Sequence, residues 1–182
     1  MNTAILHTKV QQFITENLKT DITKLILKGS PFSDVSIQEL ANQIVSKQKS
    51  EHKLASWFRT AQIYYPSKIN IEQTSSEHTA NYKSNLVSGA SIIDITGGFG
   101  IDCFYFSKQF EAVTHCEINT ELSTIVAHNF KQLKINNIST YSGDALDFLR
   151  STKEKFDCIY IDPSRRDAVK GKVFLLQDCV PN

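Results

Sequence analysis

Hydrophobic positions divide the chain into a first part with helical spacing and a second part in which apolar strands alternate with helices. To about residue 65, apolar residues recur every three or four positions, as at Leu6, Val10 and Ile14. The strands expected after this part are 91–96, 112–117, 138–142 and 156–161, and the helices between them are 101–110, 120–134 and 145–149. Strands separated by helices predict right-handed crossovers and a parallel sheet.

Helix-start signals support this division. Ser36 and Glu39 have the spacing of a capping box, in which each side chain binds the other's free backbone amide. The residues TSSE, 74–77, predict a second capping box before another helix, and a further helix is expected over 50–62. We therefore expect a helical N-terminal region over 1–68 and, over 69–182, the N-terminal part of an α/β domain with a Rossmann-like parallel sheet of about four strands.

Composition and charge are those of an ordinary globular protein. The 182 residues are 41% hydrophobic and 21% charged, and the formal net charge is +1. No overall basic field indicates a nucleic-acid partner, so any such contact must be local. The stretch 47–68 is locally basic and aromatic, and a solvated helix face with packed rings is favoured over a surface that binds RNA.

Cysteine usage and the N-terminal sequence predict a reduced, cytoplasmic protein. The four cysteines form no C-x-x-C pair, and no histidine lies at zinc-ligand spacing from a pair, so no metal is expected. The first residues lack the apolar core of a signal peptide, and no apolar run is long enough to span a membrane.

The first motif that carries chemistry is SIIDITGGFGID, 91–102. An apolar strand ends at Asp94, and a loop containing Gly97, Gly98 and Gly100 then opens a helix. Glycine lets a backbone approach a ligand closely and adopt positive φ, although an ordinary strand-to-helix turn has the same composition. The loop is not a phosphate-binding P-loop, because no G-K-[ST] follows it.

Acidic residues follow the other three expected strands. Glu117 follows the second strand, where an acid can accept both ribose hydroxyls of a nucleotide or merely favour a helix N-terminus. Asp144 follows the third strand, where it can bind an adenine amino group or cap the next helix. Asp162 follows the fourth strand. Because the carboxyl ends of parallel strands meet at one edge of a sheet, the four motifs together predict one ligand crevice.

Two nucleotide cofactors suit such a crevice. A dehydrogenase loop reads G-x-G-x-x-G, whereas TGGFGID, 96–102, lacks the third glycine. The acid immediately before the loop, Asp94, suits the cationic sulfonium and α-ammonium of S-adenosylmethionine better than a pyrophosphate. The D-x-x-x-G-x-G form therefore favours S-adenosylmethionine, and an NAD-dependent enzyme is the weaker alternative.

Residues 91–166 resemble the class I S-adenosylmethionine-dependent methyltransferases. DITGGFGID is especially similar to the D-x-x-C-G-x-G-G-N loop of the trimethylguanosine-synthase-like RNA methyltransferases, and the similarity continues through CEIN and SGDALDFL. The upstream residues EQTSSEHTANYKSNL, 72–86, resemble a segment that folds over the cofactor in that group. The whole chain is similar to bacterial proteins that join a helical N-terminal region, this core and a C-terminal THUMP-like module, and the module implies RNA as a partner, contacted partly outside this chain.

The resemblance implies a role for each candidate residue. Asp94 and the loop backbone would hold the methionine part of the cofactor, Glu117 the ribose and Asp144 the adenine. The cofactor-binding residues expected are Asp94, Thr96, Gly97, Gly98, Gly100, Glu117 and Asp144, and the catalytic residues expected are Asp162, Pro163 and Arg165.

The fourth motif, at Asp162 and Pro163, aligns with the D/N/S-P-P-Y/W motif of amine methyltransferases. There the acid or amide and the backbone carbonyls accept hydrogen bonds from the target amine and so aim its lone pair at the methyl group. In this chain Ser164 replaces the second proline and Arg165 replaces the aromatic residue that stacks on the target base. An arginine plane can stack on a base or bind phosphate.

The sequence thus predicts a methyltransferase that uses S-adenosylmethionine, acting on an RNA base nitrogen. The alternatives are a non-catalytic fragment that binds RNA or cofactor, and an NAD-dependent enzyme. A complete core of this class has seven strands, and only four are counted before Asn182, so we expect a fragment. The edge beside the fourth strand would then expose apolar surface and favour low stability or self-association.

Overall fold

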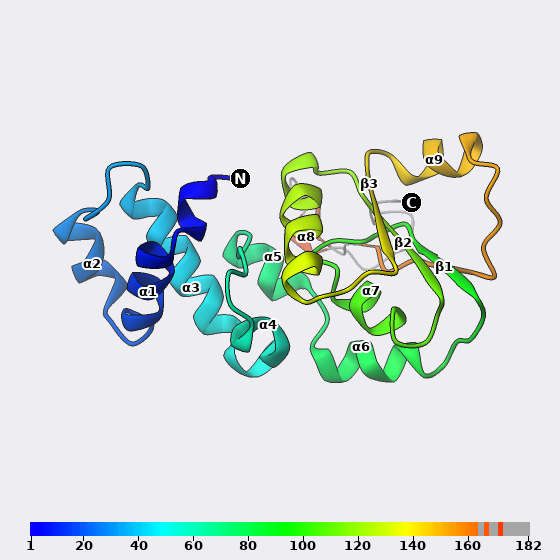
Figure 1. The fold of residues 1–182 in the computed structure, drawn as a ribbon, viewed down its shortest axis with the longest axis horizontal. Helices are drawn as coiled ribbons and strands as arrows, with labels where there is room; N and C mark the ends of the chain where they lie inside the picture. The colour runs from blue at the N-terminus through cyan, green and yellow to red at the C-terminus, as the bar shows by residue number, and fades with distance from the viewer. Residues whose placement is uncertain (164–165, 168–170, 173–182) are drawn as a thin grey trace.

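The structure of this chain is a computed structural model that describes residues 1–163, 166–167 and 171–172. Helical elements come first in the chain and lie at one end of the molecule, and the sheet lies at the other end (Figure 1). The helices are η1 (Thr3–Leu6), α1 (Thr8–Glu16), α2 (Ile22–Lys28), α3 (Ile37–Lys53), α4 (Ala55–Arg59), α5 (Lys68–Gln73), α6 (Glu77–Ser84), α7 (Ile101–Phe106), α8 (Thr120–Gln132) and α9 (Ala145–Ser151). The strands are β1 (Ser91–Asp94), β2 (Ala112–Glu117), β3 (Ile138–Ser142), β4 (Cys158–Tyr160), β5 (Arg166–Asp167) and β6 (Gly171–Lys172).

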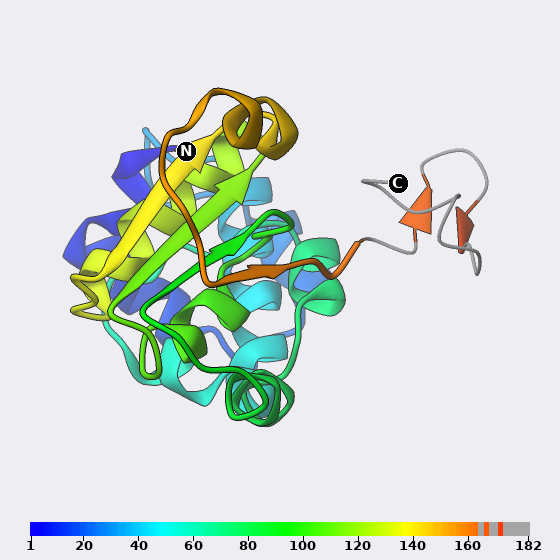
Figure 2. The same ribbon diagram turned by 90° about the vertical axis from the view of Figure 1, so that its right-hand side faces the viewer.

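Four strands form a parallel sheet in the order β3-β2-β1-β4, and β5 and β6 form a separate antiparallel pair. Helices α7 and α8 cover one face of the sheet, on the side of the N-terminal helices (Figures 1 and 2). The α/β class and the parallel sheet of four strands predicted from the sequence are confirmed. Since β1 ends at Asp94 and β2 at Glu117, the predicted motifs do lie at the carboxyl ends of strands.

Aromatic and amide side chains join the N-terminal helices to the sheet domain. The Trp57 ring is fully buried and packs against Phe104, with a centroid distance of 4.8 Å. The Asn129 amide in α8 binds both the backbone N–H and the backbone carbonyl of Tyr64, each at 2.9 Å. The prediction that the aromatic residues of 47–68 pack inside the protein is therefore confirmed for Trp57, Tyr64 and Tyr65, which are all buried.

The capping box at Ser36 is confirmed, because Ser36 and Glu39 bind each other's backbone N–H groups at 3.2 and 2.8 Å. The box predicted at 74–77 is wrong. Helix α6 starts at Glu77, and its cap is Ser76, whose hydroxyl accepts from Thr79 N–H at 3.1 Å. Both Thr74 and Ser76 fit the local pattern of a cap, and contacts elsewhere in the fold decide which one caps the helix.

The helix predicted over 50–62 is also wrong in its bounds. Helix α3 continues to Lys53, Leu54 leaves the helical region at φ −135° and ψ 61°, and the short α4 follows. Leu54 is fully buried, so the break turns its side chain into the core. Helix α5 was not predicted at all. No helix within the described part of the chain is long and apolar enough to cross a membrane.

Candidate active site

The glycine loop lies against β2 with no space for side chains at two positions. Gly97 N–H donates to the Cys116 carbonyl at 2.9 Å, and a Cβ at Gly97 would lie 2.4 Å from the His115 ring. Gly100 has φ +80°, and a Cβ there would lie 2.6 Å from Phe130. Only glycine tolerates such contacts and such φ values. The loop therefore packs directly against His115 at Gly97 and against Phe130 at Gly100.

Asp94 lies behind this loop and is only 1% exposed. Its carboxylate accepts hydrogen bonds from Thr96 N–H at 2.8 Å and from Thr96 Oγ1 at 3.1 Å, and the Cys103 thiol donates to it at 3.4 Å. Burial raises the pKa of Asp94 to about 7, since a charged carboxylate loses its hydration there. Asp94 therefore orders the loop from inside the protein.

His115 supports the loop from the β2 side, and sequence reasoning gave it no role in the site. Its ring is fully buried, and its Nε2 lies 3.2 Å from the Gly98 carbonyl oxygen. Burial lowers the pKa of His115 to about 4, so the imidazole is neutral at physiological pH. The close approach of Gly97 to this ring shows that the histidine shapes the loop. Nothing in the spacing along the chain identifies that contact.

Glu117 joins the loop to the end of the third strand. Its Oε2 accepts from Gly98 N–H at 2.9 Å, its Oε1 accepts from Asn119 N–H at 2.8 Å, and its backbone carbonyl accepts from Gly143 N–H at 3.0 Å. Asp144, next to Gly143, is exposed and caps α9 by accepting from Leu146 N–H at 2.7 Å. Both carboxylates retain lone pairs for further donors.

Thr96 joins the loop to the fourth motif. Its hydroxyl donates to Asp94 and accepts from the backbone N–H of Asp162 at 2.8 Å. The Asp162 carboxylate is exposed and contacts the Lys83 ammonium at 3.0 Å, and Pro163 beside it is half-buried. The structure thus brings the four predicted motifs together at one edge of the sheet. Arg165 lies outside the described residues, so its role stays a prediction.

Sequence reasoning missed four residues around Asp162. They are Lys83, whose ammonium contacts Asp162, and the other residues that contact this ammonium, Ser75, Asp102 and Tyr160. Asp102 and Tyr160 are part of motifs quoted for other reasons, and Ser75 and Lys83 belong to the segment 72–86. No spacing along the chain relates Lys83 to Asp102 or Asp162, which lie 19 and 79 positions away.

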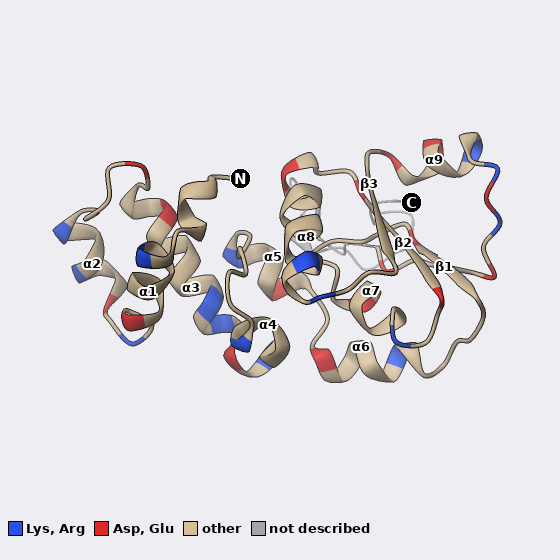
Figure 3. Ribbon diagram, viewed as in Figure 1, with Lys and Arg blue, Asp and Glu red and all other residues tan. Residues whose placement is uncertain are grey.

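Basic residues of α3 engage groups within the protein. Lys49 pairs with Glu72 at 2.7 Å, and the Lys53 ammonium donates to the carbonyls of Ile71 and Glu72 at 2.9 Å. Figure 3 shows that acidic residues are interspersed with the basic ones along the ribbon. Two of the basic residues of 47–68 are thus paired within the protein, and the interpretation of the stretch as a solvated face stays a prediction.

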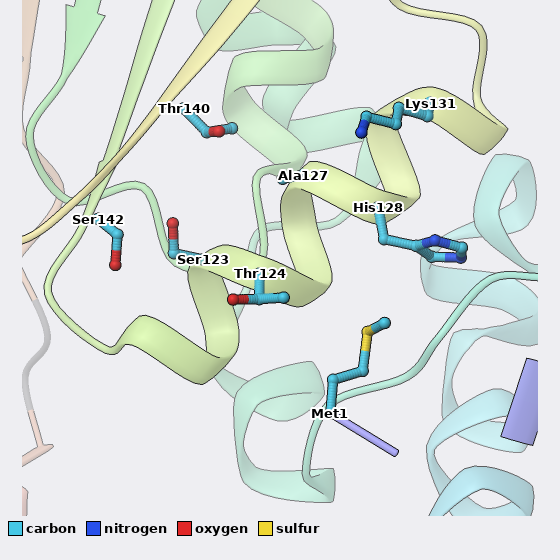
Figure 4. Close-up of a pocket in the computed structure, with 8 residues that line it drawn as sticks. All are labelled: Met1, Ser123, Thr124, Ala127, His128, Lys131, Thr140 and Ser142. Atoms are coloured by element: carbon cyan, nitrogen blue, oxygen red, sulfur yellow. The ribbon is translucent and has the colours of Figure 1, made fainter. Parts of the chain in front are cut away.

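A hollow of about 400 Å³ lies beside α8 and β3 (Figure 4). Its lining comprises Met1, Ser123, Thr124, Ala127, His128, Lys131, Thr140 and Ser142. None of these was predicted to bind or react, but Ser142 begins SGDALDFL and pairs with Glu117 in the sheet. The hollow therefore borders the candidate site at the end of β3.

Residues 66–176 match the family described as "Conserved hypothetical protein 95". The chain belongs to this family. The match covers more than half of the chain, from just before α5 through the four motifs. No curated protein matches the chain.

Solved structures of methyltransferases share the fold. The "putative methyltransferase" of Porphyromonas gingivalis W83 is 26% identical, with a TM-score of 0.79 over 98% of this chain and 44% of that protein. The O-methyltransferase of Bacillus cereus, solved in complex with SAH, is 18% identical, with a TM-score of 0.50 over 70% of this chain and 64% of that one. The chain thus spans less than half of the Porphyromonas protein, and its parallel sheet with a glycine loop is a methyltransferase fold.

Proposed function

We propose that this chain carries the cofactor site and the acceptor motif of an S-adenosylmethionine-dependent methyltransferase that acts on an RNA base nitrogen. One observation carries the proposal. The glycine loop is hydrogen-bonded on one side to Glu117, through Gly98 N–H, and on the other side to Asp162, through Thr96. A nucleotide-binding loop and an acceptor motif are thereby fixed relative to each other, as transfer between two bound molecules requires.

The residues present fit this cofactor. At Gly98 the nearest atom lies 3.7 Å from a Cβ position, so the loop backbone is open to close approach there. Glu117 and Asp144 are the acids placed to accept from ribose hydroxyls and from the adenine amino group. The expectation for Asp94 changes in detail, because a buried carboxylate acts on the methionine part through the loop that it orders. When bound, the cofactor supplies an electrophilic methyl group.

Asp162 is the residue proposed to receive the methyl acceptor. An amine N–H that donates to its carboxylate, or to the backbone carbonyl before Pro163, has its lone pair held in one direction. Alignment of this kind needs little acid–base chemistry. RNA as substrate rests on the similarity of DITGGFGID to the RNA methyltransferase loop and on the shared bacterial architecture. Arg165 would read the base or the phosphate.

Calorimetry with S-adenosylhomocysteine and with NAD tests the cofactor. We expect the wild-type chain to bind S-adenosylhomocysteine and to give no heat with NAD. Asp94→Ala should abolish binding because the loop loses its order, whereas Asp162→Ala should bind normally. Binding of NAD alone would overturn the proposal, and normal binding by both variants would show that the site is wrongly assigned.

Nucleoside mass spectrometry tests the substrate. RNA from cells with the intact gene should contain one methylated nucleoside that is absent from cells without it. A gene carrying Asp162→Ala should not restore that nucleoside. Identical nucleoside profiles, together with normal cofactor binding, would favour the alternative of a non-catalytic binding protein.

A further inference from the structure

The Lys83 ammonium lies where α6 meets α7 and the end of β4, which are distant from one another in sequence. Lys83 is in the last turn of α6, and it contacts α7, β4, the loop after β4 and the loop before α6. Its partners are Ser75 Oγ at 2.9 Å, Asp102 Oδ1 at 3.1 Å, Asp162 Oδ2 at 3.0 Å and the Tyr160 hydroxyl.

Two carboxylates of different exposure share this ammonium. The side chain of Lys83 is 22% exposed, that of Asp102 is 14% exposed and that of Asp162 is 57% exposed. Burial alone lowers the pKa of Lys83, but the charges and hydrogen bonds of Asp102 and Asp162 outweigh it, and the pKa is raised. Lys83 therefore stays charged, with one partner inside the protein and one at the surface.

The contacts made with the Asp162 carboxylate by described side chains fall on a single oxygen. Oδ2 accepts from Lys83 and, at 3.3 Å, from the Tyr160 hydroxyl. The backbone N–H of Asp162 is fixed by Thr96. A carboxylate held in this way has one rotational setting, and Oδ1 is left as the acceptor for a further donor.

A purely structural tether is the alternative explanation. The less exposed contact with Asp102 already joins α6 to α7, and these helices are packed against each other. An ion pair with an exposed carboxylate adds little to stability, typically about 0–1 kcal/mol. The contact with Asp162 therefore calls for an explanation other than holding the helices together.

We propose that Lys83 is a positioning residue for the acceptor: it binds Asp162 through Oδ2 and so directs Oδ1 to the N–H of a methyl-accepting amine. This inference rests on the proposed methyl transfer and adds that the substrate presents an N–H donor. It also gives the segment 72–86 a function, because that segment supplies both Ser75 and Lys83.

The test uses the intact gene product, unmodified total RNA from the deletion strain and radiolabelled S-adenosylmethionine. Lys83→Met keeps the length of the side chain and removes its charge. We expect a roughly tenfold to hundredfold lower kcat, as misplacement of a reacting group commonly causes. The affinity for S-adenosylhomocysteine should stay within about threefold, and Lys83→Arg should restore part of the activity.

Lys108→Met is the matched control. This lysine is exposed and lies over the rings of Phe104 and Tyr105, at 4.4 and 4.1 Å from their centroids. We expect its loss to leave kcat unchanged. If Lys83→Met unfolds below the assay temperature, Lys83→Gln, which retains a hydrogen-bond donor, takes its place.

A double variant decides whether Lys83 acts through Asp162. In the Asp162→Asn background, which keeps an acceptor oxygen and residual transfer but removes the charge, Lys83→Met should cause no further loss of transfer, because its ionic partner is already absent. A separate additional loss, an unchanged kcat for Lys83→Met, or loss of S-adenosylhomocysteine binding would each overturn the positioning role. If the wild-type protein itself binds no S-adenosylhomocysteine and transfers no label, the proposed function is wrong. This result differs from failure of the positioning role, in which the wild-type protein is active and only the variants depart from expectation.

Discussion

Gly97 and Gly98 are adjacent in the loop but require glycine for different reasons. Gly97 has no space for a Cβ, since it would lie 2.4 Å from the His115 ring and 2.8 Å from the Cys116 carbonyl. Gly98 has space, with the nearest atom at 3.7 Å from a Cβ, but its φ is +52°. The first constraint is steric contact within a packed interior, and the second is local backbone conformation.

Gly97→Ala should therefore destabilise the fold more than Gly98→Ala. Overpacking against a buried ring and a backbone oxygen costs about 3 kcal/mol, whereas a left-handed alanine costs about 1 kcal/mol. Urea unfolding of both variants against wild type measures the difference. Equal losses would show that the loop can shift away from β2.

Protonation of Asp94 and protonation of His115 change the stability of the fold in opposite directions. Folding lowers the pKa of His115 from 6.5 to about 4, so between these values the unfolded state binds the extra proton, and acid weakens the fold. Folding raises the pKa of Asp94 from 3.8 to about 7, so in this range the folded state binds the extra proton, and acid strengthens the fold. In the wild-type chain the two effects oppose each other between about pH 4 and 6.5.

In the Asp94→Asn variant, the loss of stability caused by protonation of His115 in acid should no longer be offset by Asp94. The amide oxygen can still accept from Thr96, but the proton uptake of Asp94 is gone. We expect the free energy of unfolding of this variant to fall more steeply than that of wild type between pH 6.5 and 4.5. Urea titrations at several pH values measure both slopes. Parallel curves would mean that the Asp94 carboxyl titrates alike in the folded and unfolded states.

At the scale of elements, the helix N-termini show which capping contacts the local sequence predicts and which it does not. Both serines, Ser36 and Ser76, cap their helices through side-chain oxygens, but only the first has its reciprocal glutamate. Glu77 instead binds Ser56 N–H at 2.6 Å and the Tyr105 hydroxyl at 2.9 Å, and so joins α4, α6 and α7. Glu77, the acid of the predicted capping box, is thus used in tertiary contacts with Ser56 and Tyr105.

Ser76→Ala and Thr74→Ala test this assignment of the cap. Loss of the Ser76 cap should cost about 1 kcal/mol, the usual value for such a residue. Thr74→Ala, at the position of the predicted box, should change stability by about 0.5 kcal/mol or less. Thermal unfolding of the two variants provides the comparison, and a larger loss for Thr74→Ala would restore the original prediction.

At the scale of the whole molecule, β4 is one of the two edge strands, with β3, of the sheet formed by the described residues. Ile159 and Ile161 are 51% and 54% exposed, which is high for large apolar side chains beside a strand edge. An exposed apolar edge can pair with another chain. The self-association expected from the sequence thus remains a prediction, and Ile159 and Ile161 are the residues expected to form the contact.

Light scattering of the 182-residue chain tests this edge. We expect a species larger than a monomer, and Ile159→Lys with Ile161→Lys should shift it toward monomer. Leu27→Lys is the control, because Leu27 is 82% exposed but lies in α2, away from the sheet. A sharp monomer with cooperative melting for the wild-type chain would contradict the prediction.

Patterns along the chain were enough to predict the α/β class, the four parallel strands and the glycine loop and acids that follow them. These features depend on residues within a few positions of each other, where hydrophobic period and turn chemistry act directly. The choice of Asp94, Glu117 and Asp162 as neighbours also followed, because parallel strands bring their carboxyl ends together.

Only the tertiary structure decided the contacts that each of these residues makes. Lys83 and Asp162 are 79 positions apart, and no periodicity relates them. Asp94 was expected to face a ligand and instead lies buried behind the loop, because Thr96 and Cys103 surround it. His115 supports the loop only because β1 and β2 pair in the register that places it opposite Asp94. Such contacts arise from packing of distant segments, which burial and space decide and local sequence does not encode.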